Sequence, residues 1–351
     1  MSNVPQFFIG VDLHKIVIQI CIVDKQGEII KESRYRADNL SEGLDVVQEL
    51  MPYKKNGIIS VEAVGFNRWF VNALKENDFE VIVCNPNMLN LKMSGKKTDR
   101  RDAYEIARRL MLGDIQKCAK TYYPDDDCFG KRKVIRTRHR LIEARQTLTN
   151  QIRANLSAYK LPSGLDLKTK KTRKVLWGLE WPTEDMEVVF QSLMTAFEHM
   201  TESIALLDYR LEEMSLDPMV SLLREHLPSC GPVTSTVIYY ELGDVTRFKN
   251  SRTVASYAGL VPRVNQSADK SHHGRLTKRG NRELRHILGE WAIRLMHSDE
   301  RVVAWAEPRL KRTHKNKIRM ALARRLLIGV YKMLLTGELF SMERCLGMER
   351  G

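Results

Sequence analysis

Hydrophobic residues in the first 112 positions form short runs that predict a mixed α/β domain. β-branched and aromatic side chains dominate five of these runs, which predict strands over residues 7–13, 16–23, 28–36, 58–63 and 79–84. Hydrophobic residues that recur every three or four positions predict helices over residues 40–50, 67–76 and 99–112. This order of elements predicts a strand meander followed by βαβ units.

From Gly130 onward the hydrophobic period changes to one that predicts two long helices. In the first, Val134, Leu141 and Leu148 recur at intervals of seven. The second, for which Thr183 is the expected cap, alternates steps of three and four at Phe190, Leu193, Phe197, Met200, Ile204, Leu207, Leu211 and Met214. This stripe predicts a coiled-coil face, which an antiparallel hairpin, ordinary core packing or a dimer arm would each bury.

The residues that follow predict a third unit, mostly helical, with frequent proline and glycine turns. We therefore expect three domains: an α/β domain over residues 1–118, a helical coiled-coil region for oligomerisation over residues 119–225, and a mainly α-helical domain over residues 226–351. In the third domain, residues 227–242 resemble a helix-hairpin-helix turn, and an ordinary turn between helices fits them equally well.

Composition excludes several classes of protein. No apolar run reaches the roughly 18 residues of a membrane span, and no basic residues precede the first apolar stretch as they would in a signal peptide. The 6 cysteines lack Cys-x-x-Cys spacing, which argues against a zinc ribbon or a disulfide scaffold. We expect a cytoplasmic protein with reduced cysteines and no membrane partner.

The charge of the chain is uneven as well as basic, with 57 Lys and Arg against 43 Asp and Glu. Residues 91–175 carry 23 basic against 9 acidic residues, residues 176–225 carry 2 against 11, and residues 226–351 carry 23 against 11. Two basic blocks predict two polyanion-binding surfaces, because neutralised phosphates supply most non-specific nucleic-acid affinity. Nucleic acid is therefore the expected partner, and a basic surface without such a partner is the alternative.

Four carboxylates occupy positions that together predict a metal centre. Asp12 and Glu62 lie in or at the end of apolar strands, where an uncompensated charge is costly. Asp99 and Asp102 are three residues apart, so a helix places both on one face. If the helix crosses the ends of neighbouring strands, the four acids would hold two Mg²⁺ ions about 4 Å apart and activate a phosphodiester. Taken singly, each acid is explained equally well as a cap or a surface charge. Expected phosphate-binding residues beside them are Lys96, Lys97, Arg100 and Arg101.

The third unit contains a hydroxyl surrounded by cations, which suggests a nucleophile for phosphoryl transfer. Ser267 follows a stretch punctuated by glycine and proline, and nearby cations would stabilise charge on a phosphorus under attack. Ser251, Ser256 and Ser271 are rivals, since serines in loops usually cap or solvate. The expected phosphate-binding residues here are Arg263, Lys270, Arg275, Lys278, Arg279, Arg282 and Arg285.

These motifs resemble, in the same order along nearly the whole chain, those of the DEDD transposases of the IS110 insertion-sequence family, to which pilin-gene invertases are related. The matching segments are Gly-Val-Asp12, Val-Glu62-Ala, Lys-Thr-Asp99-Arg-Arg-Asp102-Ala, Tyr-Ala-Gly-Leu-Val-Pro (257–262) and Thr-Lys-Arg-Gly-Asn-Arg-Glu-Leu-Arg (277–285). One departure is Ala268, where the family commonly has glycine after the serine; it leaves open whether Ser267 or Ser271 is the nucleophile.

The resemblance implies an RNase H-like (RuvC-like) first domain in which Asp12, Glu62, Asp99 and Asp102 bind Mg²⁺, and a C-terminal transposase domain with Ser267 as the nucleophile. It also implies double-stranded donor and target DNA, an element-encoded noncoding bridge RNA that pairs with both, and a homo-oligomer, either a dimer or a tetramer. The implied reaction is recombination through a phosphoserine link and a Holliday junction.

Three other functions remain open at this stage. A protein-directed DNA invertase would work without the RNA. A RuvC-like metal-dependent nuclease or junction resolvase would use the acids alone, with the C-terminal domain only binding DNA. A non-catalytic nucleic-acid-binding protein would use the acids structurally, and neither chelation of Mg²⁺ nor an Asp12→Asn change would then alter its effect on DNA.

Overall fold

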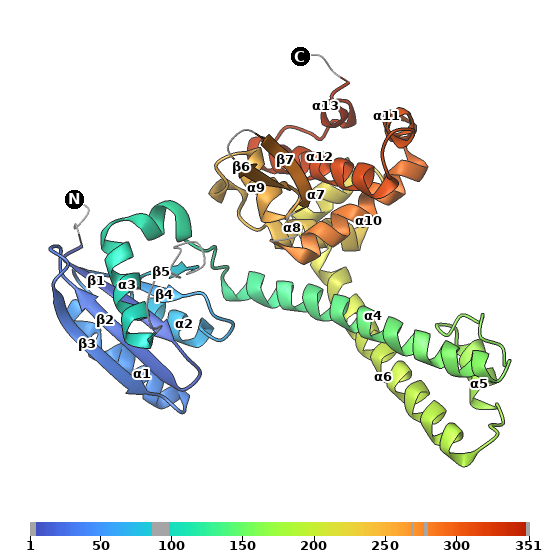
Figure 1. Cartoon of the computed structure of the whole chain (residues 1–351), viewed down its shortest axis with the longest axis horizontal. Coiled ribbons are helices and arrows are strands. Elements are labelled where there is room, and N and C mark those ends of the chain that lie inside the picture. The colour runs from blue at the N-terminus through green and yellow to red at the C-terminus, as the bar shows by residue number, and fades with distance from the viewer. Residues whose placement is uncertain (1–4, 86–97, 268–269, 277–279, 349–351) are drawn as a thin grey trace. The chain divides into compact units, whose positions relative to one another are not determined.

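A computed structural model describes residues 5–85, 98–267, 270–276 and 280–348, with the backbone alone described over residues 262–276. The chain divides into two compact units, Met1–Tyr123 and Pro124–Gly351. Figure 1 shows the first as a sheet with helices and the second as largely helical.

The first unit contains a five-stranded mixed sheet, as the sequence predicts. Its strands are β1 (Phe7–Leu13), β2 (Val17–Val23), β3 (Ile29–Arg36), β4 (Gly57–Glu62) and β5 (Glu80–Cys84), in the order β3-β2-β1-β4-β5. The first three strands pair antiparallel, whereas β4 runs parallel to both β1 and β5. The helical elements are α1 (Leu40–Glu49), a 3-10 turn (Met51–Tyr53), α2 (Arg68–Glu76), α3 (Asp99–Met111) and a π-helical turn (Ile115–Ala119).

Alternation along β1 directs its side chains to two faces of the sheet. Ile9, Val11 and Leu13 enter the core that α1 and α2 cover. Gly10 faces α3 instead, where an added Cβ would lie 2.1 Å from the carbonyl oxygen of Ala103. Glycine at this position therefore lets α3 lie directly on the sheet, with its first turn near the end of β1.

The second unit begins with a helical hairpin of α4 (Asp126–Ala158) and α6 (Glu184–Met214), joined through α5 (Lys170–Trp177). The two long helices run in opposite directions and pack against each other (Figure 1). Thr183 caps α6 as predicted, its hydroxyl accepting a hydrogen bond from the Met186 backbone N–H. Phe190 and Phe197 of the predicted stripe share a buried cluster with Ile152 of α4. The stripe is thus buried at least partly within the chain, and a coiled coil with a second copy stays a prediction.

The rest of the second unit surrounds a core in which Trp291 is fully buried. Its elements are α7 (Pro218–His226), α8 (Pro232–Leu242), a 3-10 turn (Val245–Arg247), α9 (Ser251–Tyr257), β6 (Pro262–Ser267), β7 (Lys270–Leu276), α10 (Arg282–Ser298), α11 (Glu300–Leu310), α12 (Lys315–Thr336) and α13 (Met342–Leu346). The antiparallel hairpin β6–β7 was not predicted. Its strands are rich in polar residues and lack the apolar alternation that marks a half-buried strand.

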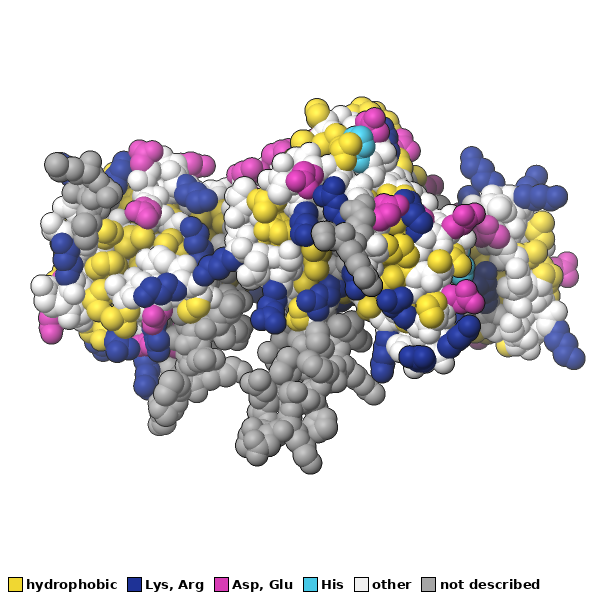
Figure 2. Space-filling model, turned by 90° about the horizontal axis from the view of Figure 1, so that it is seen from above, with side chains coloured by type: hydrophobic (Ala, Val, Ile, Leu, Met, Phe, Trp, Pro, Cys, Tyr) yellow, Lys and Arg dark blue, Asp and Glu magenta, His cyan; other side chains and the backbone are white. Residues whose placement is uncertain are grey.

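Two features of the described residues bear on the expectations from composition. The cysteines are all free thiols. Among the helices described, none combines the length and the apolar character that crossing a membrane requires. On the face seen in Figure 2, Lys and Arg side chains are spread among acidic and hydrophobic ones.

Candidate functional site

Asp12 is a buried carboxylate on the face of the sheet that carries α3. Only 4% of its side chain is exposed, so removing this charge from water requires a compensating cation or hydrogen-bond donors. The parallel register aligns Val11 with Val61, and the next residue of each strand is Asp12 and Glu62. Residues that face each other across parallel strands share a face of the sheet, so the register directs Glu62 to the side of Asp12.

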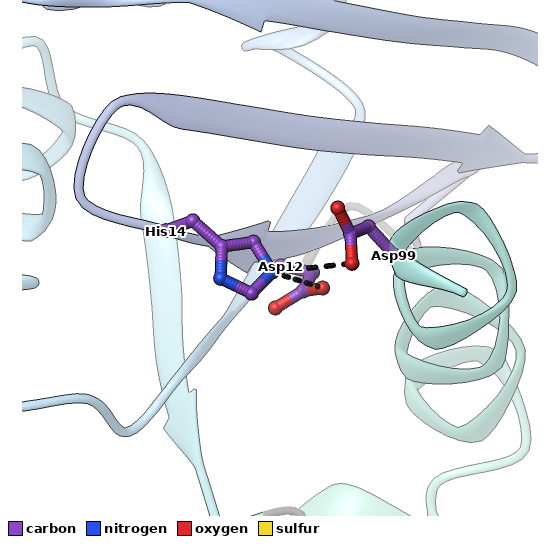
Figure 3. A group of neighbouring side chains, drawn as sticks. All are labelled: Asp12, His14 and Asp99. Carbon is purple, nitrogen blue, oxygen red and sulfur yellow. Dashed lines mark ion pairs between the residues drawn. The ribbon is translucent and has the colours of Figure 1, made fainter. Parts of the chain in front are cut away.

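Asp99 is the first residue of α3, and its side chain lies near Asp12. It meets Asp12 through His14, whose Nε2 lies 3.3 Å from Asp12 Oδ2 and 3.4 Å from Asp99 Oδ1 (Figure 3). One potential ligand atom from each of the three residues lies within 4.8 Å of the other two. The described structure therefore joins a strand end, a turn and a helix start into one candidate cation site.

Glu62 and Asp102 lie outside this group of three among the described residues. Glu62 ends β4, where its backbone carbonyl accepts a hydrogen bond of 2.9 Å from Asn67 Nδ2. Asp102 lies in the first turn of α3, three residues beyond Asp99, and both its side chain and that of Glu62 are half-buried. Two of the four predicted metal ligands thus share a compact site, while Asp102 lies on the same helix as Asp99 and Glu62 lies on β4, which pairs with β1.

His14 is the residue of this site that the sequence analysis missed. It lies in the turn between β1 and β2, where its backbone N–H donates to the carbonyl of Val17. A single histidine in a turn has no periodic signal. Its position two residues after a buried aspartate was the one available clue.

The predicted nucleophile belongs to the second unit, at the tip of the β6–β7 hairpin. Ser267 ends β6 and pairs with Lys270, while its rival Ser271, on β7, pairs with Gln266 of β6. Ser251 and Ser256 lie in α9 instead. Ala268, the departure from the family pattern, lies outside the described residues.

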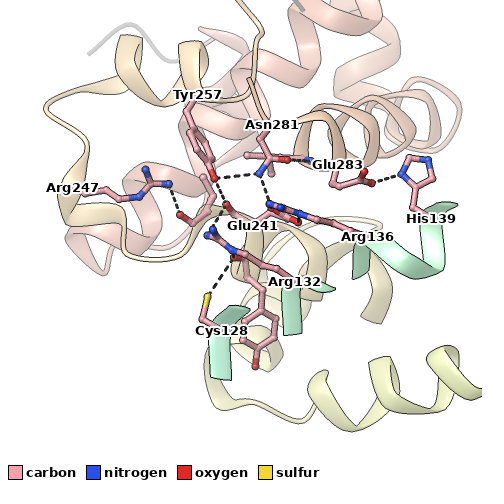
Figure 4. A network of polar contacts seen from close by, with 12 residues as sticks. Cys128, Arg132, Arg136, His139, Glu241, Arg247, Tyr257, Asn281 and Glu283 are labelled. Carbon is pink, nitrogen blue, oxygen red and sulfur yellow. Dashed lines mark hydrogen bonds and ion pairs between the residues drawn. The ribbon is translucent and has the colours of Figure 1, made fainter. Parts of the chain in front are cut away.

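A buried polar network includes residues that precede and follow this hairpin in the sequence (Figure 4). The Glu241 side chain is fully buried and accepts two hydrogen bonds of 2.8 Å from Arg136 and one of 2.6 Å from Asn281 Nδ2. The Tyr257 hydroxyl donates to the backbone carbonyl of Glu241. Gly280 has φ +122°, and an added Cβ would lie 2.4 Å from the carbonyl oxygen of Tyr257. Tyr257, Gly280 and Asn281, all from the recognised motifs, therefore connect the chain before and after the hairpin to Glu241 of α8, which also binds Arg136 of α4.

Comparison with known proteins assigns the chain to a family. Residues 222–307 match the family described as "Transposase IS116/IS110/IS902 family", and residues 9–161 match the DEDD transposase domain of IS110, described as "Transposase". The chain belongs to this family of transposases.

Relatives of this IS110-family transposase match along nearly its whole length. The transposase of insertion sequence IS1111A from Coxiella burnetii is 25% identical over 95% of this chain and 90% of its own length. The transposase of IS1328 from Yersinia enterocolitica is 23% identical over 97% of this chain and 100% of its own. A structural likeness to Thermus thermophilus RuvC covers 33% of this chain and 99% of RuvC, with 12% identity and a TM-score of 0.26.

A groove of about 700 Å³ opens beside Asp99 in the first unit of the transposase. Its lining residues are Gln19, Glu32, Ser33, Arg34, Thr98, Asp99 and Arg100. Strand register places Asp12, Gln19 and Arg34 in one row across β1, β2 and β3. Arg100 forms an ion pair with Glu32, which raises the pKa of the Arg100 guanidinium. Two cationic side chains, Arg34 and Arg100, thus line the same groove as Asp99.

The other predicted phosphate-binding residues have different surroundings. Arg101 is exposed on α3. Arg282 forms an ion pair with Glu143, and Arg285 donates to the carbonyl of Ala258 at 3.0 Å. Burial, together with the neighbouring charge of Arg282, lowers the pKa of Arg285. Arg263, Lys270 and Arg275 lie on the hairpin strands, where the backbone alone is described, and Lys96, Lys97, Lys278 and Arg279 lie outside the described residues.

Proposed function

We propose that this IS110-family transposase recombines DNA with two chemical centres, a carboxylate metal site in the first unit and the Ser267 hydroxyl in the second. The observation that carries the proposal is the meeting of Asp12 and Asp99 with His14 at one point of a DEDD-family chain. The proposal assigns metal chemistry in an RNase H-like domain to residues 1–118, assembly to residues 119–225 and serine chemistry to residues 226–351.

The donor set near Asp12 suits a hard divalent cation. A buried carboxylate and a half-exposed one face the same point, and carboxylate oxygens are the ligands that Mg²⁺ prefers. Asp12, Glu62, Asp99 and Asp102 are the residues that would hold the metal. When bound, Mg²⁺ supplies positive charge to the phosphate oxygens of the strand being cut.

Ser267 would act by direct attack on a DNA phosphate. Its Oγ forms a bond to phosphorus and gives up its proton, while the bond from phosphorus to a sugar oxygen breaks and that oxygen leaves as a DNA hydroxyl. The phosphoserine ester keeps the number of phosphoester bonds unchanged, so a hydroxyl of another strand can reverse the attack and join the strands. Repeated on a second pair of strands, this exchange passes through a Holliday junction.

Several features support nucleic-acid partners and a multimer. Arg34 and Arg100 line the groove beside Asp99, where they would contact the phosphates of donor or target DNA. The two basic segments of the sequence, residues 91–175 and 226–351, could bind two nucleic acids, a bridge RNA as well as DNA. Leu206 and Tyr209 of α6 are 71% and 63% exposed, as expected if α6 also packs against a second copy in a dimer or tetramer. We place this reaction in the cytoplasm.

Recombination by the purified protein tests the proposal. RNA that co-purifies with the protein is sequenced, and DNA sites that its loops could pair with are offered as substrates in Mg²⁺. Recombinant product is expected with the wild type and with Ser271→Ala, and is expected to fall at least about 100-fold with Asp12→Asn and with Ser267→Ala. Unchanged recombination by Asp12→Asn, or after chelation of Mg²⁺, would exclude the metal centre. Recombination without any RNA would favour a protein-directed invertase.

A further inference from the structure

We propose that His14 is a direct metal ligand, so that Asp12, Asp99 and His14 share one ion and the centre binds Mn²⁺ more tightly than Mg²⁺. This inference rests on the proposed metal centre and adds a nitrogen donor to it. None of the four DEDD positions is a histidine, so the family motif does not include this residue.

The distances around His14 match those between ligands of a single ion. Two donor atoms that each lie about 2.1 Å from a metal are about 3.0 Å apart at a right angle and about 3.4 Å apart at a tetrahedral angle. His14 Nε2 lies 3.3 Å from an oxygen of Asp12 and 3.4 Å from an oxygen of Asp99. The three side chains point toward one another from separate elements (Figure 3), so one ion could reach all three.

The backbone holds His14 in this position. Its N–H donates to the Val17 carbonyl at 2.8 Å, and the carbonyl of Ile16 in the same turn accepts a bond of 3.0 Å from the Ala37 N–H. On the other side, the contact between Gly10 and Ala103 fixes α3 and with it Asp99. The site is thus built on a strand, a turn pinned to the sheet and a helix held against it, which is the rigidity that a metal site needs.

The exposure of the three side chains fits an ion that enters from solvent. Asp12 is 4% exposed, whereas His14 and Asp99 are 50% and 43% exposed. An ion would therefore meet Asp99 and His14 at the surface and Asp12 beneath them.

The nitrogen donor determines which metal the centre prefers. Mg²⁺ favours a shell made only of oxygen ligands, whereas imidazole is a good ligand for transition metals. Mn²⁺ carries the same charge as Mg²⁺ and accepts oxygen and nitrogen donors together, so it would use all three residues. Mg²⁺ would depend mainly on the carboxylates.

Electron paramagnetic resonance of Mn²⁺ bound to the full-length protein tests the proposal without requiring activity. Electron spin echo modulation from a coordinated imidazole nitrogen is expected in the wild type and is expected to vanish in His14→Ala. Mn²⁺ affinity should fall about tenfold or more in that variant, while Mg²⁺ affinity, measured by competition, should change less than about threefold. His199→Ala, which removes an exposed histidine from α6, is the matched control and should behave as the wild type.

The outcomes separate this inference from the proposed function. Mn²⁺ binding that depends on Asp12 but gives no nitrogen modulation, or modulation that persists in His14→Ala, would overturn the role of His14 and leave the carboxylate centre intact. If Asp12→Asn changes Mn²⁺ binding no more than His199→Ala does, the metal centre itself fails. His14→Gln, which retains a polar side chain of similar reach, should also lose the modulation; circular dichroism of both His14 variants checks that they are folded.

Discussion

At the scale of single residues, the transposase depends on buried charges that have specific partners. Glu241 is fully buried in α8 and receives hydrogen bonds from Arg136 of α4 and Asn281 at the start of α10. Arg132 reaches the same helix end by donating to the carbonyl of Tyr240 at 2.7 Å. A buried carboxylate with all its partners in place is tolerated, but the partners become costly when it is removed.

Glu241→Ala is therefore expected to destabilise the second unit by about 3 kcal/mol, because it removes the carboxylate that accepts hydrogen bonds from the partly buried Arg136 guanidinium and from Asn281. Urea unfolding followed by tryptophan fluorescence measures the change. Glu213→Ala removes an exposed carboxylate that pairs with Arg210 and should leave the unfolding midpoint within experimental error. Equal midpoints for the two variants would contradict the role given to Glu241.

At the scale of elements, the position of α3 on the sheet determines whether the acids meet. α3 supplies Asp99, and β1 supplies Asp12, so the two carboxylates come together only while the helix lies close to the strand. Gly10 makes that approach possible, since any side chain there would collide with the backbone of Ala103 and Ala107.

Gly10→Ala is expected to push α3 away from β1, lowering the stability of the first unit by about 1–3 kcal/mol and weakening Mn²⁺ binding. Thermal unfolding and a Mn²⁺ titration measure the two effects. Gly65→Ala is the control, because a Cβ there meets no atom within 4 Å. Mn²⁺ binding by Gly10→Ala at wild-type affinity would show that the acids do not depend on this contact.

The elements also show what could be predicted from the sequence and what could not. Runs of β-branched and aromatic residues marked the five strands. The helical period marked the long helices, because burial of one face of a helix leaves a repeat in the sequence. The β6–β7 hairpin left no such repeat. The residues that form the network around Glu241 lie in helical sequence that gave no signal of their contacts. Asp12 was recognisable as a charge inside an apolar strand. Its neighbour His14 could be recognised only from the structure, because the conformation of the turn brings it between Asp12 and Asp99.

At the scale of the whole molecule, the proposed reaction requires chemistry from two units that are far apart in the sequence. The acids lie in residues 1–123 and Ser267 lies in residues 124–351. The proposed reaction needs both centres at one phosphodiester, whether they come from the same chain or from two copies. The family motifs in the sequence predicted that the acids and the serine would lie in different units. Hydrophobic period and charge alone did not predict it.

The most direct test of that claim is a covalent protein–DNA adduct, trapped in denaturant from an active Mg²⁺ reaction and mapped by mass spectrometry. We expect an adduct on the peptide that contains Ser267, lost in both Ser267→Ala and Asp12→Asn and retained in Ser271→Ala. An adduct that forms at the wild-type level in Asp12→Asn, or recombination in which no adduct forms, would contradict it.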